Sequence, residues 1–172
     1  MSNRLPADAE TIFRHLSDSL KASIEAAGGE PPALIGIHSG GAWLAARLHH
    51  ELGLSSPLGF LSSAFHRDDL QARGLPGRLQ ATRIDFEVTG QSIVLVDDIL
   101  HTGRTIRAAL NEIFDYGRPA RVSLAVLIDR QGRELPIQPD HVGAEILLQP
   151  GERLVLSQQT SGVFDLRIDE GK

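Results

Sequence analysis

The sequence feature that most constrains the fold is an uninterrupted apolar run, Ser92 to Val96, that passes directly into Asp97 and Asp98. Such a run is typical of a strand with both faces covered, as in a parallel sheet. After a short loop, apolar residues recur at helical spacing from Ile106 to Phe114, and a second apolar run follows at Val122 to Ile128. Strand, helix and strand joined by short loops predict a right-handed parallel βαβ unit.

The rest of the chain extends this pattern. Apolar positions recur at helical spacing between Asp8 and Ala27, a strand is expected at Ala33 to Ile37, a second helix opens at Gly40, and another strand is expected at Leu58 to Phe65. Further short strands are expected at Ile146 to Leu148, Arg153 to Leu156 and Val163 to Ile168. The sequence predicts one α/β domain over residues 1–172, a twisted, mostly parallel sheet flanked by helices on both faces.

Composition narrows the functional classes. The chain has no Cys, which excludes disulfide scaffolds, cysteine-ligated zinc and thiol catalysis. The formal net charge of −5 argues against a surface coated with positive charge for nucleic acid, but it leaves room for a local basic patch. The N-terminus lacks the apolar core of a signal peptide and no apolar run reaches ~18 residues, so we expect a cytoplasmic protein without membrane association.

The loop after the central strand has the composition of a phosphate site. In α/β sheets the ligand binds beyond the carboxyl ends of the strands. Thr102, Gly103, Arg104 and Thr105 lie there and start a helix, whose N-terminal N–H groups bind anions. Two carboxylates beside this loop suit a sugar phosphate, because they accept hydrogen bonds from vicinal hydroxyls and bind Mg²⁺. An acidic turn followed by a helix cap is the alternative interpretation.

The whole run, VLVDDILHTGRT, resembles the phosphoribosyl-pyrophosphate (PRPP) signature of type I phosphoribosyltransferases. Its continuation to DRQGRELPIQPDHVG, with LIGIHSGGAWLA and FHRDDL upstream, is similar to the bifunctional pyrimidine operon regulator and uracil phosphoribosyltransferase family (PyrR). The resemblance covers about residues 10–146. It implies the type I phosphoribosyltransferase fold, with a flexible flap at about 66–84 and a small hood formed by the N-terminal and C-terminal segments.

The resemblance implies the reaction of uracil with PRPP to give UMP and diphosphate, with Mg²⁺ as cofactor. In regulatory members it also implies binding to the leader mRNA of pyrimidine genes, controlled by UMP or UTP. Three functions stay open: a uracil phosphoribosyltransferase, a non-catalytic regulator that senses UMP and binds mRNA, and a phosphoribosyltransferase for another nucleobase. A homo-oligomer, dimeric or larger, is also expected.

The resemblance assigns roles around the motif. Asp97 and Asp98 match the acidic pair expected to hold the ribose hydroxyls, to place Mg²⁺ directly or through water, and to stabilise positive charge at the anomeric carbon. The alternative is that only one of them faces the ligand, because successive side chains diverge at a strand end. The segment from Thr102 to Thr105 matches the 5′-phosphate loop, with a solvated charge at the helix start as the alternative for the Arg104 side chain. His101 stands where relatives carry an acidic residue or Tyr, and it is a candidate for moving a proton from the base nitrogen. A solvent-facing loop residue is the alternative for His101.

Upstream, His38, Ser39, Gly40 and Gly41 match the pyrophosphate loop, whose backbone N–H groups fit a diphosphate. Several relatives carry Thr-Arg-Gly here, so an expected Arg is absent, and His38 either compensates or packs. The RDD motif offers further contacts. Arg67 is a candidate for holding pyrophosphate. Asp68 and Asp69 are candidates for binding Mg²⁺ or for orienting Arg67.

The base site is expected in the segment after the second run of the βαβ unit. Asp129 and Arg130 match this region, and a carboxylate at Asp129 suits the N3–H of uracil. His141 replaces the usual stacking aromatic, and the backbone groups of Val142 are candidates for reading the uracil edge. RNA binding has no recognition motif, and it would need the fold to gather Arg4, Arg14, His15, Arg47, His49 and His50.

Overall fold

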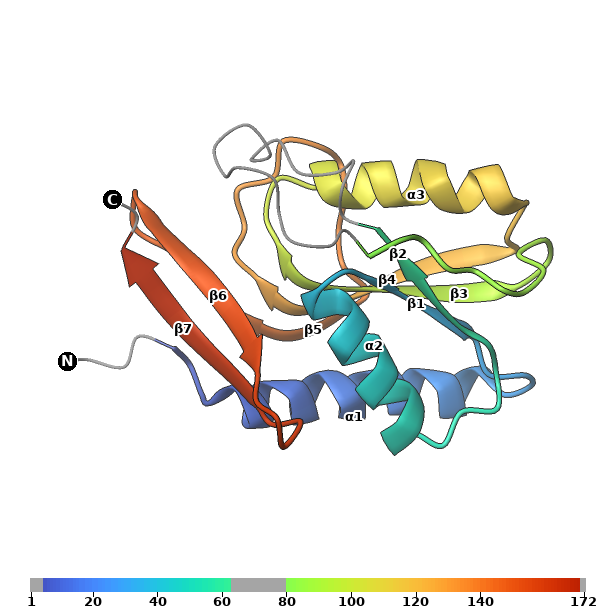
Figure 1. Cartoon of the computed structure of the whole chain (residues 1–172), viewed down its shortest axis with the longest axis horizontal. Coiled ribbons are helices and arrows are strands. Elements are labelled where there is room, and N and C mark those ends of the chain that lie inside the picture. The colour runs from blue at the N-terminus through green and yellow to red at the C-terminus, as the bar shows by residue number, and fades with distance from the viewer. Residues whose placement is uncertain (1–4, 63–79, 171–172) are drawn as a thin grey trace.

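The computed structural model describes residues 5–62 and 80–170. Its centre is a sheet of five parallel strands in the order β2-β1-β3-β4-β5 (Figure 1). The strands are β1 (Ala33–Ile37), β2 (Leu58–Leu61), β3 (Ser92–Leu100), β4 (Arg121–Asp129) and β5 (His141–Glu145). Because all five run the same way, their carboxyl ends meet at one edge of the sheet.

Helices cover both faces of this sheet. The helices α1 (Ala9–Ala27) and α2 (Gly40–Glu51) lie on one face, against β4, β5, β1 and β3, and α3 (Arg104–Tyr116) lies on the other (Figure 1). Alternate residues of β3 serve the two sides: Val94 and Val96 join the core beneath α1 and α2, while Ile93 and Leu95 join the core beneath α3. The predicted βαβ unit with two covered faces is confirmed.

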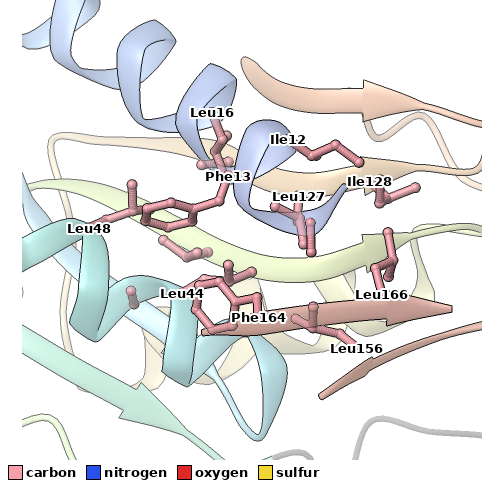
Figure 2. Packing of buried hydrophobic residues seen from close by; sticks show 14 of the residues in the cluster. Ile12, Phe13, Leu16, Leu44, Leu48, Leu127, Ile128, Leu156, Phe164 and Leu166 are labelled. Carbon is pink, nitrogen blue, oxygen red and sulfur yellow. The ribbon is translucent and has the colours of Figure 1, made fainter. Parts of the chain in front are cut away.

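A two-stranded antiparallel hairpin, β6 (Glu152–Gln158) and β7 (Phe164–Glu170), packs against α1 and α2. Figure 2 shows Phe164 and Leu166 of β7 within the same cluster as Phe13 of α1 and Leu44 of α2. The rings of Phe13 and Phe164 lie 5.4 Å apart at a tilted angle. The hairpin is therefore part of the main core.

An ionic cluster also ties this hairpin to both helices. The Arg47 guanidinium of α2 donates two hydrogen bonds of 2.7 Å to the Glu10 carboxylate of α1. The same carboxylate accepts the backbone N–H of Phe164 at 2.7 Å. The guanidinium also stacks over the rings of Phe13 and Phe164, at 4.4 and 5.0 Å from their centroids. Hydrogen bonds and cation–π contacts thus fix α1, α2 and β7 together.

The element boundaries agree with the sequence patterns in most places. The first helix begins after Asp8, whose carboxylate accepts the N–H of Thr11 at 2.9 Å and caps the helix. The expected strand from Leu58 is seen to Leu61, and its remainder falls mostly outside the described residues. Most of the predicted flap falls outside them too. At its described end, Arg83 forms an antiparallel bridge with Phe60.

One predicted strand is wrong. The apolar residues 146–148 are not a strand, and β5 lies directly before them at His141–Glu145. Ile146 packs into the core, but Leu147 is 68% exposed, so the apolar pattern there comes from a loop. The true strand has a mixed sequence, HVGAE, because it lies at the edge of the sheet and is only partly covered. Within the described ranges, none of the helices has the length and apolar character needed to cross a membrane.

Candidate active site

The site predicted from the sequence lies where β3 ends. Val96 is in register with Gly36 of β1 and Ala125 of β4, so Asp97 and Asp98 follow at the carboxyl edge of the central strand. Asp97 is 5% exposed, and its Oδ1 accepts the N–H of Asp98 at 2.9 Å. Asp98 is half-buried, and its Oδ1 accepts the N–H of Ile99 at 2.9 Å. Both carboxylates are thus held by the strand that carries them.

The start of α2 is packed against this acidic pair. A Cβ atom on Gly40 would lie 2.6 Å from the carboxyl carbon of Asp98, and one on Gly41 would lie 2.9 Å from the Cα of Asp97. Only glycine fits at these positions. No side chain caps this helix at Ser39. The fold therefore brings the predicted pyrophosphate loop beside the predicted ribose-binding carboxylates, and the partial positive charge of the helix N-terminus faces them.

The predicted 5′-phosphate loop has a comparable helix start. Gly103, the N-cap of α3, has a φ of 91° and has no side chain with which to cap the helix. A Cβ at Gly103 would lie 3.0 Å from the Ile137 side chain, so both the backbone conformation and the space favour glycine. The N–H of Arg104 donates to the Thr102 hydroxyl at 3.2 Å. The Arg104 side chain pairs with Glu134 at the exposed surface, so a phosphate at this helix start would have to take the Arg104 N–H from the Thr102 hydroxyl.

Two histidines border the acidic edge. His101 is exposed, and its ring lies against Gly132, where an added Cβ would come within 2.8 Å of Nε2. Partial burial and then the charges of Arg130 and Arg133 lower the pKa of His101, against an opposing effect of Glu134. Partial burial also lowers the pKa of His38, whose ring lies 5.5 Å from that of Phe60. Both rings are therefore neutral at pH 7 and able to accept a proton.

The structure gives Asp129 different partners from those expected. Its two carboxylate oxygens accept hydrogen bonds from Arg133 at 2.8 and 2.6 Å, and Oδ1 also accepts the N–H of Gln131 at 2.8 Å. Burial alone would raise the pKa of Asp129, but these hydrogen bonds outweigh it and lower the pKa. The carboxylate is engaged within the protein, and this arrangement does not support a contact with uracil N3–H.

Sequence reasoning missed Arg133, although the signal was present. The run DRQGR places Asp129 and Arg133 four residues apart, the spacing of a possible ion pair. The neighbouring Arg130 is half-exposed, and its backbone N–H donates to the carbonyl of Leu100 at 3.0 Å. This bond continues the contact between the ends of β3 and β4.

His141 lies away from the acidic edge. It is in register with Ala125, four residues before β5 ends, and it is 8% exposed. Its Nδ1 lies 3.0 Å from the Ser19 hydroxyl of α1, and burial lowers its pKa. Val142, the next residue, packs against the core beneath α3 instead. The side chains of His141 and Val142 thus lie on opposite faces of the sheet, and the buried position of His141 does not support stacking on a base. The expected role of Val142 concerns its backbone groups and stays a prediction.

The remaining predicted contacts are the residues of the RDD motif. Arg67, Asp68 and Asp69 lie outside the described residues. Within residues 5–62 and 80–170 there is no group of three His, Asp or Glu side chains that could hold a metal by itself. The adjacent Asp97 and Asp98 fit Mg²⁺ nonetheless, because this ion is usually bound by one or two carboxylates with substrate phosphates and water completing its shell.

A separate groove of about 590 Å³ runs beside α2. Trp43, Phe60 and Val163 supply much of its apolar lining, and His38 of the predicted pyrophosphate loop is part of its wall. Among the described residues, neither the Asp97 and Asp98 carboxylates nor the loop from Thr102 to Thr105 lines this groove.

Comparisons with known proteins place this arrangement in a class. A family model described as the phosphoribosyl transferase domain matches residues 7–147. A hypoxanthine-guanine phosphoribosyltransferase from Bacillus anthracis superposes with a TM-score of 0.66 at 19% identity, over 86% of this chain and 83% of that one. The hypoxanthine phosphoribosyltransferase of Trypanosoma cruzi gives 0.61 at 20% identity, over 85% and 83%. The predicted type I phosphoribosyltransferase fold is confirmed.

Sequence relatives narrow the class. The Bifunctional protein PyrR of Pseudomonas aeruginosa is 51% identical over 152 residues, which cover 88% of this chain and 89% of that protein. The Bifunctional protein PyrR of Nitrosococcus oceani is 49% identical over 150 residues, covering 86% and 85%. The chain therefore belongs to the PyrR family of phosphoribosyltransferases.

Proposed function

We propose that this protein transfers the 5-phosphoribosyl group of PRPP to N1 of uracil and releases diphosphate. One observation carries the proposal: the fold gathers two helix N-termini, whose N-cap residues make no side-chain capping bond, and a pair of carboxylates at a single edge of the sheet. PRPP has a phosphate, a diphosphate and a ribose with vicinal hydroxyls between them. The two helix starts suit the anionic groups, and the carboxylates suit the hydroxyls.

In this reaction the bond between C1′ and the diphosphate oxygen breaks, and a bond between C1′ and N1 of uracil forms. Uracil gives up its N1 proton, and a neutral His101 at the edge of the site is a candidate acceptor. As the diphosphate leaves, positive charge develops at C1′. Asp97 and Asp98, which are fixed by their own strand, stabilise this charge without having to reorganise.

The metal expected in this reaction is Mg²⁺. Asp97 and Asp98 would hold it directly or through water, with the phosphates of PRPP completing the shell. When bound, the ion supplies positive charge that offsets the charge of the departing diphosphate. Asp68 and Asp69 remain further candidates from the sequence, and a homo-oligomer likewise remains a prediction.

The choice of uracil is supported by the PyrR relatives, and a base panel tests it. Purified protein with PRPP and Mg²⁺ should convert labelled uracil to UMP, and it should give no product with hypoxanthine or orotate. Turnover of hypoxanthine or orotate in place of uracil would contradict the choice of base. A failure with all three bases would favour the non-catalytic regulator.

The relatives' designation as bifunctional supports a second function, regulation of pyrimidine genes through UMP-dependent binding to leader mRNA. The structure limits where such a surface would lie. Arg14 and His15 are exposed on α1, whereas Arg47 is engaged by Glu10 and Glu51. Filter binding to leader RNA, with and without UMP at two salt concentrations, tests this function. Binding that responds to neither UMP nor salt would contradict it.

A further inference from the structure

The Arg133 side chain lies at the centre of a hydrogen-bond cluster behind the site. Its Nε donates to the carbonyl of Ile137 at 2.8 Å. One terminal nitrogen donates to the carbonyl of His101 at 3.0 Å and to Asp129 Oδ1 at 2.8 Å, and the other donates to Asp129 Oδ2 at 2.6 Å. The Arg133 side chain is 15% exposed. One side chain therefore joins Asp129 at the end of β4, His101 just before the phosphate loop, and Ile137 in the segment that follows β4.

The segment that Arg133 holds also contacts the phosphate loop directly. The carbonyl of Thr102 accepts the N–H groups of Glu134 and Leu135 at 3.0 and 3.2 Å. The Ile137 side chain lies over Gly103, close enough that a Cβ there would meet it at 3.0 Å. The start of α3 is thus fixed from behind by residues 134–137, and Arg133 fixes those residues to β4.

The chemistry of this cluster requires arginine. Four of the five guanidinium N–H groups donate hydrogen bonds. Three from the terminal nitrogens reach Asp129 and His101 and one from Nε reaches Ile137, which a planar, fork-shaped donor group can satisfy together. A lysine ammonium is a point charge and cannot keep the bidentate bond to Asp129 while also reaching both carbonyls. Asp129 is buried, so its charge depends on this pairing.

We propose that Arg133 is a positioning residue, oriented by Asp129, that sets the 5′-phosphate loop at the distance from Asp97 and Asp98 that a phosphoribosyl group requires. The inference rests on the proposed function, because it assumes that the loop from Thr102 to Thr105 binds the phosphate of PRPP. It predicts that Arg133 acts on the binding of the sugar phosphate and leaves the binding of the base unchanged.

The test compares Arg133→Lys with Arg153→Lys, a matched change at an exposed position of β6. Arg133→Lys should raise the KM for PRPP by about 10- to 100-fold, the effect of losing a charge-assisted hydrogen bond, and leave the KM for uracil within twofold. The dissociation constant of ribose 5-phosphate, measured by calorimetry, should rise by the same factor. Arg153→Lys should change none of these values.

A double variant separates positioning from stability. Asp129→Asn with Arg133→Gln leaves no unpaired buried charge, so it should recover most of the melting temperature lost by Arg133→Gln alone. Its KM for PRPP should stay raised, because the carbonyls of His101 and Ile137 still lack the guanidinium. Recovery of the KM together with the melting temperature would overturn the proposal, and so would a KM for PRPP that never changes.

The two proposals fail in different ways. If the unmodified protein makes no UMP from uracil, the proposed function fails, yet ribose 5-phosphate binding still reports on the phosphate loop. If the unmodified protein makes UMP and Arg133→Lys binds ribose 5-phosphate normally, the positioning role fails and the proposed function stands.

Discussion

Replacement of Gly40 by Ala would displace the Asp98 side chain in the proposed site, and the structure defines by how much. The new Cβ would lie 2.6 Å from the carboxyl carbon of Asp98 and 2.8 Å from its Cβ. Carbon atoms in ordinary contact are about 3.5 Å apart, so roughly 1 Å of movement is needed. Asp98 cannot give way freely, because its Oδ1 holds the N–H of Ile99 at 2.9 Å.

A misplacement of about 1 Å in a reacting group costs on the order of 100-fold in rate. That factor corresponds to about 2.7 kcal/mol of transition-state stabilisation. The loss should fall on kcat/KM and not on the fold, because Ala favours a helix over Gly by roughly 0.5–1 kcal/mol and offsets part of the clash.

The assay is steady-state formation of UMP from labelled uracil at varied PRPP, with thermal unfolding measured alongside. The control is Gly29→Ala, where the added Cβ meets no atom within 4 Å but the φ of 80° is unfavourable for Ala. The control should lose stability, by about 1–2 kcal/mol, and keep its kcat/KM. A Gly40→Ala variant with kcat/KM within threefold of the unmodified protein would refute the packing argument for Asp98.

Three further predictions concern stability. Phe164→Ala should lower the free energy of unfolding by about 3–5 kcal/mol in urea titrations, because the ring fills the core between α1 and β7; a loss below about 1 kcal/mol would contradict this. Glu10→Gln should cost about 1–3 kcal/mol, since it removes the charged partner of Arg47, and a melting temperature unchanged from the unmodified protein would argue against that cluster. Burial lowers the pKa of His141 in the folded protein, so unfolding below its ordinary pKa of about 6.5 is accompanied by proton uptake. The unfolding free energy should therefore fall as pH drops from 7 to 5, and His141→Asn should reduce that slope; an unchanged slope would exclude His141 as a contributor.

The elements that carry the site were predictable from the sequence. The apolar run that ends in Asp97 and Asp98 fixes the central strand, and the glycines at 40 and 103 mark the two helix starts packed against neighbouring segments. These signals are local: a buried strand needs apolar residues on both faces, and a close backbone approach needs glycine.

The base side of the site was less predictable, because it depends on tertiary pairing. Asp129 looks like an open acceptor in sequence, and only the folded chain shows that Arg133 occupies both its oxygens. His141 looks like a loop residue at a binding edge, yet the register of β5 with β4 places it beneath α1. Strand register at a sheet edge is a long-range property that spacing along the chain does not encode, whereas Asp129 and Arg133 are only four residues apart and their pairing could have been read from the run DRQGR.

The proposed function depends on Asp97 and Asp98 forming the ribose site of a uracil phosphoribosyltransferase. Its most direct test is the rate of UMP formation from uracil and PRPP by the Asp97→Asn, Asp98→Asn double variant, beside Asp18→Asn, which changes an exposed carboxylate on α1. The double variant should lose roughly 100- to 1,000-fold or more in kcat while its melting curve stays cooperative. Asp18→Asn should match the unmodified protein. Full turnover by the double variant would contradict the account.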